Sequence, residues 1–188
     1  MQGKLGILFA LAMMVVLALP ALAGDTVTAT VTPLVVRSVT LDISSVDYGT
    51  LSTSTSDGSR TTGTSSAITA TNNGNSLEDV YVRGTDAVDA NSGDGVDTPW
   101  TLDCSFNDAD IDGAVALDQY VHRYDVGGSF VPAEALTICK HPTPGQKKIQ
   151  DNLTASGTFQ FVLQINMPTA TSGFSARNMT VTLVATAF

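Results

Sequence analysis

Residues 159–166 read Phe-Gln-Phe-Val-Leu-Gln-Ile-Asn, and large apolar side chains occupy every second position of this run. Side chains of a β-strand point alternately to the two faces of a sheet, so the pattern predicts a strand over 157–167 with one face in a core. A second run at 179–187, Met-Thr-Val-Thr-Leu-Val-Ala-Thr-Ala, predicts a long strand over 177–187. The two runs favour an all-β chain.

The rest of the chain continues this alternation, and no window of a dozen residues has the apolar stripe of a helix. Thr, Val and Ile, which fit a pleated and half-buried surface, fill the alternating runs, while Gly, Asn, Asp, Ser and Pro separate them. We expect an immunoglobulin-like antiparallel β-sandwich. Its further strands are expected near 26–32, 34–43, 66–72, 78–84, 99–104, 117–124 and 135–139.

Two segments between the predicted strands have the composition of a loop or a turn. Residues 52–66 contain eleven Ser or Thr in fifteen positions, which bury little apolar surface and so predict a flexible loop or a loose sheet edge. Residues 72–75, Asn-Asn-Gly-Asn, lie between two predicted strands, and Asn-Gly pairs tolerate the positive φ of a tight turn. We therefore expect a β-hairpin at 72–75.

The first residues have the three parts of a secretory signal peptide. Lys4 gives the charged region, residues 5–19 are apolar, and Ala21-Leu22-Ala23 is a small-residue cleavage site. We expect a signal peptide over 1–23, a single β-sandwich domain over 24–188, and an extracellular or cell-surface location. The apolar run is shorter than the roughly 18–20 residues of a membrane-spanning helix, so no retained membrane span is expected.

The charge of the chain is strongly acidic. It contains 18 Asp and Glu against nine Lys and Arg, and removal of the signal peptide would take away Lys4 as well. Such a surface repels nucleic acid and anionic lipid, and it suits solubility or the binding of cations. We therefore expect no nucleic-acid partner.

Cys104 and Cys139 are the two cysteines of the chain. In an exported protein the expected state is a disulfide, which in the chain-entropy model would contribute about 3–4 kcal/mol to stability. The alternative is a pair of partly buried thiols. The sequence has no G-x-S-x-G, H-E-x-x-H or phosphate-loop motif, and its two histidines, His122 and His141, stand in dissimilar contexts. We expect no enzymatic activity.

An acidic run in the middle of the chain contains the opening of a calcium-binding loop. Asp108, Asp110 and Asp112 alternate ahead of a glycine, as in the D-x-D-x-D-G pattern whose carboxylates converge on a hard cation. The twelfth position of the loop is Gln119 instead of glutamate, and Asp118 lies one place earlier. Two interpretations stay open: these four aspartates bind calcium, the one cofactor that the sequence suggests, or they belong to a solvated acidic loop without an ion.

The chain has five segments that resemble parts of known exported surface proteins: 26–33, 39–43 and 46–51 at the opening of the predicted mature chain, and 68–75 and 179–187 in its later part. The opening of the predicted mature chain resembles spore coat protein U-like pilus subunits. Later segments are similar to an uncharacterised group of exported bacterial or archaeal Ig-like sandwich proteins and to camelysin-type matrix fibre proteins. The resemblance implies a secreted or cell-surface structural protein that assembles into a fibre or matrix.

Residues 24–32 are the candidate for such assembly. In fibre-forming relatives a terminal strand leaves its own domain and completes the sheet of a neighbour, with a residue such as Pro33 as hinge. Val27, Ala29 and Val31 would be the inserted side chains, and the protein would be a homo-oligomer or part of a surface matrix. Two alternatives stay open: the strand pairs within its own sheet, or the domain is an adhesin-like module that recognises a glycan or a protein through its loops.

Overall fold

The computed structural model describes residues 30–54, 60–90, 98–105, 115–140, 147–173 and 175–187. The chain divides into two units, Met1–Leu34 and Val35–Phe188, and every strand within the described ranges belongs to the second. All regular elements in the described ranges are strands, as the alternation of the sequence predicts. In this part of the chain no helix has the length and apolar character of a membrane span.

The larger sheet is built around β10 (Thr158–Asn166) and β7 (Gln119–Val126), which pair antiparallel from Phe161 and Val126 to Asn166 and Val121. The order of strands along the sheet is β1-β3-β10-β7-β6, with β2 also paired to β10 and β8 to β7. The remaining strands are short: β1 (Val39–Leu41), β2 (Thr62–Thr64), β3 (Ile68–Asn72), β6 (Thr101–Leu102) and β8 (Leu136–Thr137).

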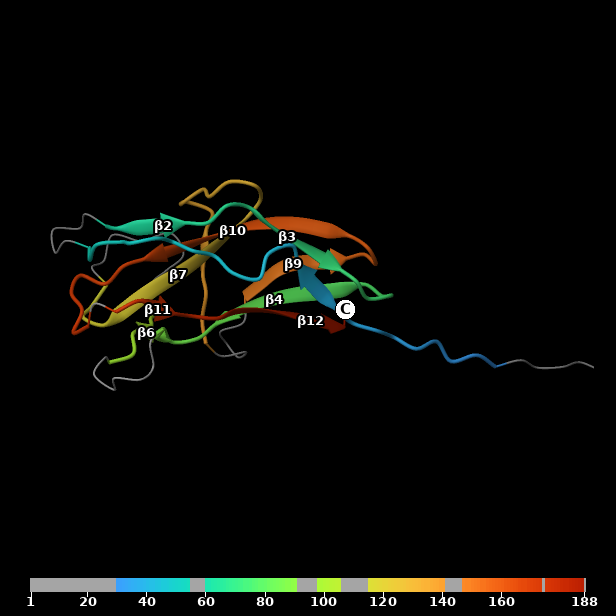
Figure 1. Cartoon of the computed structure of the whole chain (residues 1–188). Coiled ribbons are helices and arrows are strands. Elements are labelled where there is room, and N and C mark those ends of the chain that lie inside the picture. Colours follow the sequence, from blue (N-terminus) through green and yellow to red (C-terminus); the bar gives the residue numbers. More distant parts are fainter. Residues whose placement is uncertain are drawn as a thin grey trace, which may run out of the picture. The chain divides into compact units, whose positions relative to one another are not determined.

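The smaller sheet has the order β12-β4-β9, and all its pairs are antiparallel. Its strands are β12 (Val181–Ala187), β4 (Glu78–Gly84) and β9 (Lys147–Leu153). A separate two-stranded ribbon joins β5 (Val88–Asp89) to β11 (Arg177–Asn178). Figure 1 shows the two sheets as facing layers.

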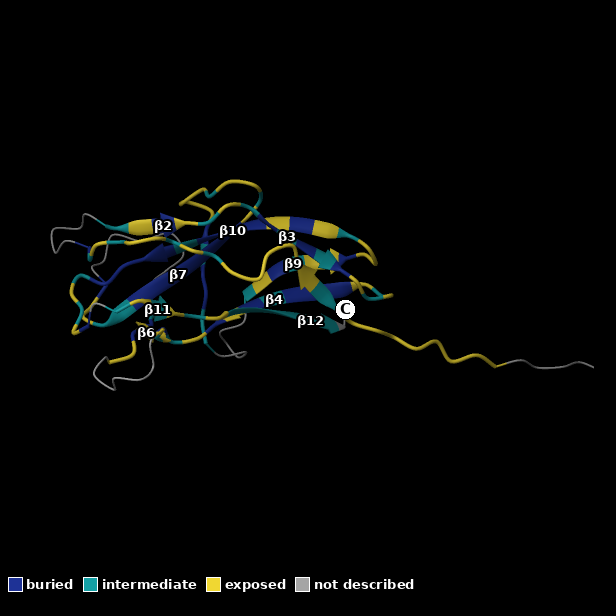
Figure 2. Cartoon of the chain, in the orientation of Figure 1, coloured by how far each residue is buried: buried dark blue, intermediate teal, exposed yellow. Residues whose placement is uncertain are grey.

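The core lies between these two layers. Val80 and Val82 of β4 pack in one cluster with Phe159, Phe161 and Leu163 of β10. In Figure 2 β4 and β7 are mostly buried, while β12 is of intermediate exposure. The fold is therefore an all-β sandwich, as predicted. Its immunoglobulin-like character and the signal peptide stay predictions.

The long runs of alternating apolar residues form strands in the structure. The strands of polar composition have no such pattern in the sequence. The strands predicted at 66–72, 78–84, 117–124 and 157–167 correspond to β3, β4, β7 and β10. Three strands were not predicted: β2, β5 and β9. Of these, β9 reads Lys-Lys-Ile-Gln-Asp-Asn-Leu and has a polar edge composition without clear alternation. Residues 30–32 lie outside any strand, and the start of the strand predicted at 26–32 lies outside the described residues.

The strand predicted over 34–43 is reduced to β1 because side chains capture its first backbone groups. The Val36 N–H donates to Asn75 Oδ1 at 2.8 Å, and the Ser38 N–H donates to Glu78 Oε1 at 2.9 Å. These backbone groups are thus bonded to side chains of the turn and of β4.

The β-hairpin predicted at 72–75 is wrong, because β3 and β4 belong to different sheets. The segment is a corner between the layers. The buried Asn72 amide donates to two carbonyl oxygens, one of them that of Leu153 in β9, and its Oδ1 accepts the N–H of Gly74 at 2.7 Å. A Cβ at Gly74 would collide with the carbonyl oxygen of Val36. The position therefore requires glycine because of close packing, and not because of a positive φ.

Candidate functional site: a cleft at the edge of the sandwich

One edge of the sandwich is open between the chain that follows β1 and the chain that leads through β11 into β12. A cavity of about 200 Å³ lies next to a wider one of about 840 Å³, and both are lined by residues 44–46, Tyr48 and Met179. We call the two together the edge cleft. The edge cleft lies between the two sheets where their edge strands β1 and β12 do not pair.

The floor of the edge cleft is apolar and its rim is rich in hydroxyl groups. Ile68, Phe161 and Leu163 of the larger sheet and Val181 and Leu183 of the smaller sheet line the narrow end. The wide end is surrounded by the side chains of Ser44, Ser45, Thr50, Ser52, Thr53, Thr171 and Ser175. Such a surface suits an extended chain that presents apolar side chains on one face and polar ones on the other.

Residues 43–52 form the outer side of the cleft, and we call this segment the wall. The chain is bonded just before it, where the Asp42 N–H donates to Thr69 O, and just after it, where the Ser54 N–H donates to Pro168 O. Between these points the Gly49 N–H donates to Asp47 Oδ1, and no backbone–backbone bond joins the wall to another described residue. The wall is therefore an extended border without a partner strand.

The opposite side of the cleft ends in the outer edge of β12. The Thr85 N–H donates to Thr180 O, whereas the Gly84 N–H is turned away from β12 to Cys139 O. Because the bonds of an antiparallel ladder alternate, the N–H groups of 181, 183 and 185 point away from β4. No described strand pairs with that edge of β12.

The two edges of the smaller sheet differ in how they are protected. β12 reads Val-Thr-Leu-Val-Ala-Thr-Ala, without a charge or a proline. β9 carries Lys147 and Lys148, and its pairing with β4 shifts register twice. The Lys148 ammonium lies 2.6 Å from the carboxylate of Asp79, and this hydrogen bond is the main cause of the lowered pKa of Asp79. Charged side chains and bulges make it unfavourable for another strand to pair with β9. β12 has neither of these features.

A partly buried polar pair joins the wall to the larger sheet at the narrow end of the cleft. The Tyr48 hydroxyl lies 2.8 Å from Nε2 of His122, and the two rings meet edge to face. His122 is 2% exposed, and burial lowers its pKa to about 4. Burial also raises the pKa of Tyr48. Both groups are therefore uncharged at neutral pH.

Trp100, the one tryptophan of the sequence, lines the wide end of the cleft. The residue is 6% exposed, and its Nε1–H donates to Thr171 Oγ1 at 2.9 Å. The guanidinium of Arg177 lies 5.4 Å from the ring centroid, close enough for a cation–π contact. This indole reports on the environment of the cleft.

Several predicted site residues lie outside the described residues: Val27, Ala29, Asp108, Asp110 and Asp112. Val31 is described and is 84% exposed. Asp118 is bonded to the chain that follows β10, since its Oδ1 accepts the Ser172 N–H at 2.8 Å. Across the ranges that the structure describes, no three His, Cys, Asp or Glu side chains are grouped as metal ligands. Calcium binding stays a prediction.

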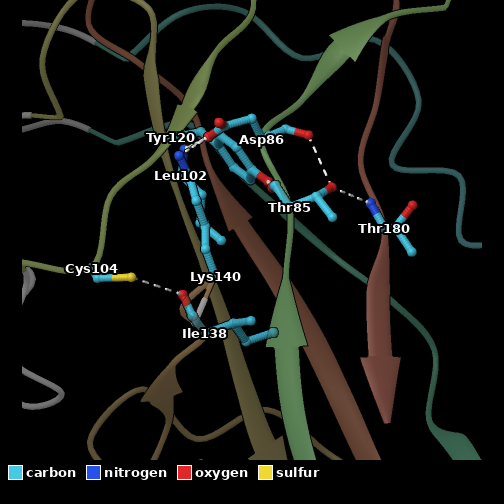
Figure 3. Close-up of polar contacts among 8 residues, drawn as sticks. All are labelled: Thr85, Asp86, Leu102, Cys104, Tyr120, Ile138, Lys140 and Thr180. Atoms are coloured by element: carbon cyan, nitrogen blue, oxygen red, sulfur yellow. Dashed lines mark hydrogen bonds and ion pairs between the residues drawn. The ribbon is translucent and has the colours of Figure 1, made fainter. Parts of the chain in front are cut away.

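Cys104 and Cys139 are thiols that follow two strand ends converging on β7. β6 runs parallel to β7 and β8 runs antiparallel to it. The Asp103 N–H donates to Tyr120 O and the Ile138 N–H to His122 O, two residues further along. Cys104 Sγ consequently lies 3.8 Å from the carbonyl oxygen of Ile138, the neighbour of Cys139 (Figure 3).

Asp86 holds the same two strand ends in place. Its Oδ1 accepts the Leu102 N–H at 2.8 Å and forms an ion pair with Lys140 (Figure 3). Tyr120 adds a hydrogen bond from its hydroxyl to the carbonyl oxygen of Thr85. The backbone on both sides of the cysteine pair is thus fixed to the start of the β4–β5 connection.

Sequence reasoning did not identify the edge cleft. A signal for it exists in the wall, where Val46 and Tyr48 alternate as in a strand although no strand pairs with them. No protein-family model, curated protein or solved structure matches the chain.

Proposed function

We propose that this protein is a secreted or cell-surface structural subunit that assembles by β-strand addition at the edge cleft. The added strand is residues 24–32 of a neighbouring copy, the donor segment. The observation that carries the proposal is the uncharged, uncovered edge of β12 beside a wall without backbone pairing and above an apolar floor. An added strand gains main-chain hydrogen bonds from such an edge and specificity from the cavities below it.

The donor segment has the complementary pattern. Val27, Ala29 and Val31 alternate with threonines at the intervening positions, so one face suits the apolar floor and the other the hydroxyl-rich rim. Val31 is exposed, as an unpaired donor side chain would be. Insertion of each segment into the next copy is a head-to-tail contact, which produces a filament unless the rotation closes a ring.

The first test compares two substitutions on opposite faces of the donor segment in the mature chain that begins at Gly24. Val31→Asp would carry a charge into the apolar floor, and we expect it to raise the concentration needed for assembly by at least about tenfold. Thr30→Asp places the same charge on the other face and should assemble nearly as the wild type does. Negative-stain microscopy and light scattering after size exclusion measure both.

The acceptor side is tested at Ala185, whose N–H is directed to the uncovered edge. Ala185→Pro removes that donor without breaking a bond to β4, so it should block assembly while the monomer stays folded, and Ala185→Val should assemble normally. A wild-type chain that stays monomeric at all concentrations, or equal behaviour of Val31→Asp and Thr30→Asp, contradicts the proposal. Capture of a glycan by such a monomer would instead favour the adhesin-like alternative.

A disulfide between Cys104 and Cys139 belongs to the same proposal, because an exported subunit meets an oxidising environment. Its formation removes two hydrogens from the pair and requires a thiol oxidant such as a small-molecule disulfide. We expect the mature chain, isolated without reductant, to have a mass two hydrogens below that of the dithiol. Reduction should lower the free energy of unfolding by about 3–4 kcal/mol, and Cys104→Ser should be insensitive to the reductant. An unchanged mass after exposure to the oxidant would contradict the pairing.

A further inference from the structure

The wall is held by backbone bonds at its two ends, and between them by few polar contacts and by the packing of Val46, Tyr48 and Leu51 against the core. Ser54 fixes the far end twice, through its N–H to Pro168 O and its hydroxyl to Met167 O. Near this end the Ser52 and Thr61 hydroxyls lie 3.3 Å apart. Segments with few backbone hydrogen bonds open locally at a lower free energy than the strands around them. The wall is thus a segment fixed at both ends, and we call such a segment a strap.

Tyr48 is the central attachment of this strap. Its hydroxyl reaches across the sandwich to His122 of β7, which lies 74 positions away in the sequence. The Tyr48 side chain also lines both cavities of the edge cleft. Displacement of the wall would therefore break the pair with His122 and widen both cavities in the same movement.

We propose that the wall is a movable strap, latched by the hydrogen bond between Tyr48 and His122, whose release opens the edge cleft. The pair suits a latch because both groups are uncharged and joined by a single bond, whose net contribution is modest and therefore reversible. Gly49 lies next to the latch with φ 67°, and no other atom is within 4 Å of the position of a Cβ there. Gly49 itself therefore makes no packing contact beyond its chain neighbours, whereas Val46, Tyr48 and Leu51 pack against the core and must move together with the latch. The role of the strap in admitting a donor strand rests on the proposed function.

Trp100 gives a direct measure of the movement, because it is the single indole and lines the wide end of the cleft. The experiment measures acrylamide quenching of its fluorescence in the mature chain, at concentrations where the chain is monomeric. Tyr48→Phe removes the latch hydroxyl and keeps the ring. We expect the quenching constant to rise at least about twofold, because the open state becomes more populated.

Tyr81→Phe is the matched control. Tyr81 lies on β4 and does not line the edge cleft, and the Lys148 ammonium lies 5.9 Å from the centroid of its ring, a contact that phenylalanine keeps. Unchanged quenching in this variant and increased quenching in Tyr48→Phe, with both chains fully folded by circular dichroism, support the strap. If Tyr48→Phe lowers the melting temperature but leaves the quenching constant at the wild-type value, the bond is merely structural and the strap is refuted.

Assembly is measured separately on the same variants, which keeps the two proposals distinct. Faster assembly of Tyr48→Phe at equal concentration supports strand entry through the opened cleft. Increased quenching without assembly of any chain leaves the strap in place and refutes strand addition. Normal assembly together with wild-type quenching refutes the strap alone.

Discussion

Acidification from pH 6.5 to pH 4 is expected to lower the free energy of unfolding by about 3 kcal/mol through His122 alone. In the unfolded chain the imidazole is protonated near its usual pKa of 6.5, whereas burial lowers the pKa in the folded chain to about 4. Between these values the unfolded state binds more protons. Stability therefore falls as the pH falls through this window, and the effect vanishes well above pH 6.5, where the imidazole is neutral in both states.

Urea unfolding at pH 7, 5.5 and 4 measures this effect. His122→Gln keeps a polar side chain at the site and removes the titration, so it should lose the His122 part of the slope between pH 6.5 and 4. The effect of His122 can be separated from that of Asp79. Because the pKa of Asp79 is lowered in the folded chain, its contribution to stability is lost only at a pH below the window of His122. The same pH dependence in wild type and His122→Gln would show that His122 is not buried as described.

Asn72→Ala is expected to cost about 3 kcal/mol or more, although it removes only a small polar group. The side chain of Asn72 is fully buried, donates to the carbonyl oxygens of Ser76 and Leu153, and accepts the Gly74 N–H. Alanine would leave these three backbone groups without their partner, at about 1–3 kcal/mol for each group that stays buried. The corner between β3 and β4 would lose its connection to β9.

Asn73→Ala is the neighbouring control. The amide of Asn73 makes one exposed hydrogen bond, to Thr40 Oγ1 at 2.8 Å, so its loss should change stability by about 0.5 kcal/mol or less. Chemical unfolding of both variants at pH 7 gives the comparison. Equal effects of the two substitutions would mean that the corner tolerates the loss of the Asn72 bonds, for instance by admitting water.

The elements that could be predicted from sequence are those whose side chains face two different environments. β10 and β7 are long, and large apolar residues occupy alternate positions of β10. Its buried face could therefore be recognised from the sequence without knowing which strands pair with it. β9 was missed because an edge strand buries little and carries lysines. The turn at 72–75 was recognised as a turn and misassigned as a hairpin, since Asn-Gly specifies a change of direction and not the sheet that the chain enters next.

The edge cleft, by contrast, could not be predicted from the sequence. Tyr48 stands in a segment with strand-like alternation, and His122 stands in a predicted strand, but nothing local associates two residues so far apart. The proximity of Cys104 to the Ile138–Cys139 peptide arises in the same way, from one parallel and one antiparallel neighbour that approach each other along β7. The sequence predicted that the cysteines pair, but it could not predict where in the fold their bond would lie.

The sequence by itself determined the all-β class, the main buried strands and the acidic charge, because side-chain alternation and composition are local properties that need no knowledge of the partner strand. Only the tertiary structure decided that β12 has an uncovered edge, that the wall has no backbone partner, and that His122 meets Tyr48. These features depend on which strands pair and which layers stack, and the contacts that settle those choices join residues distant in the sequence.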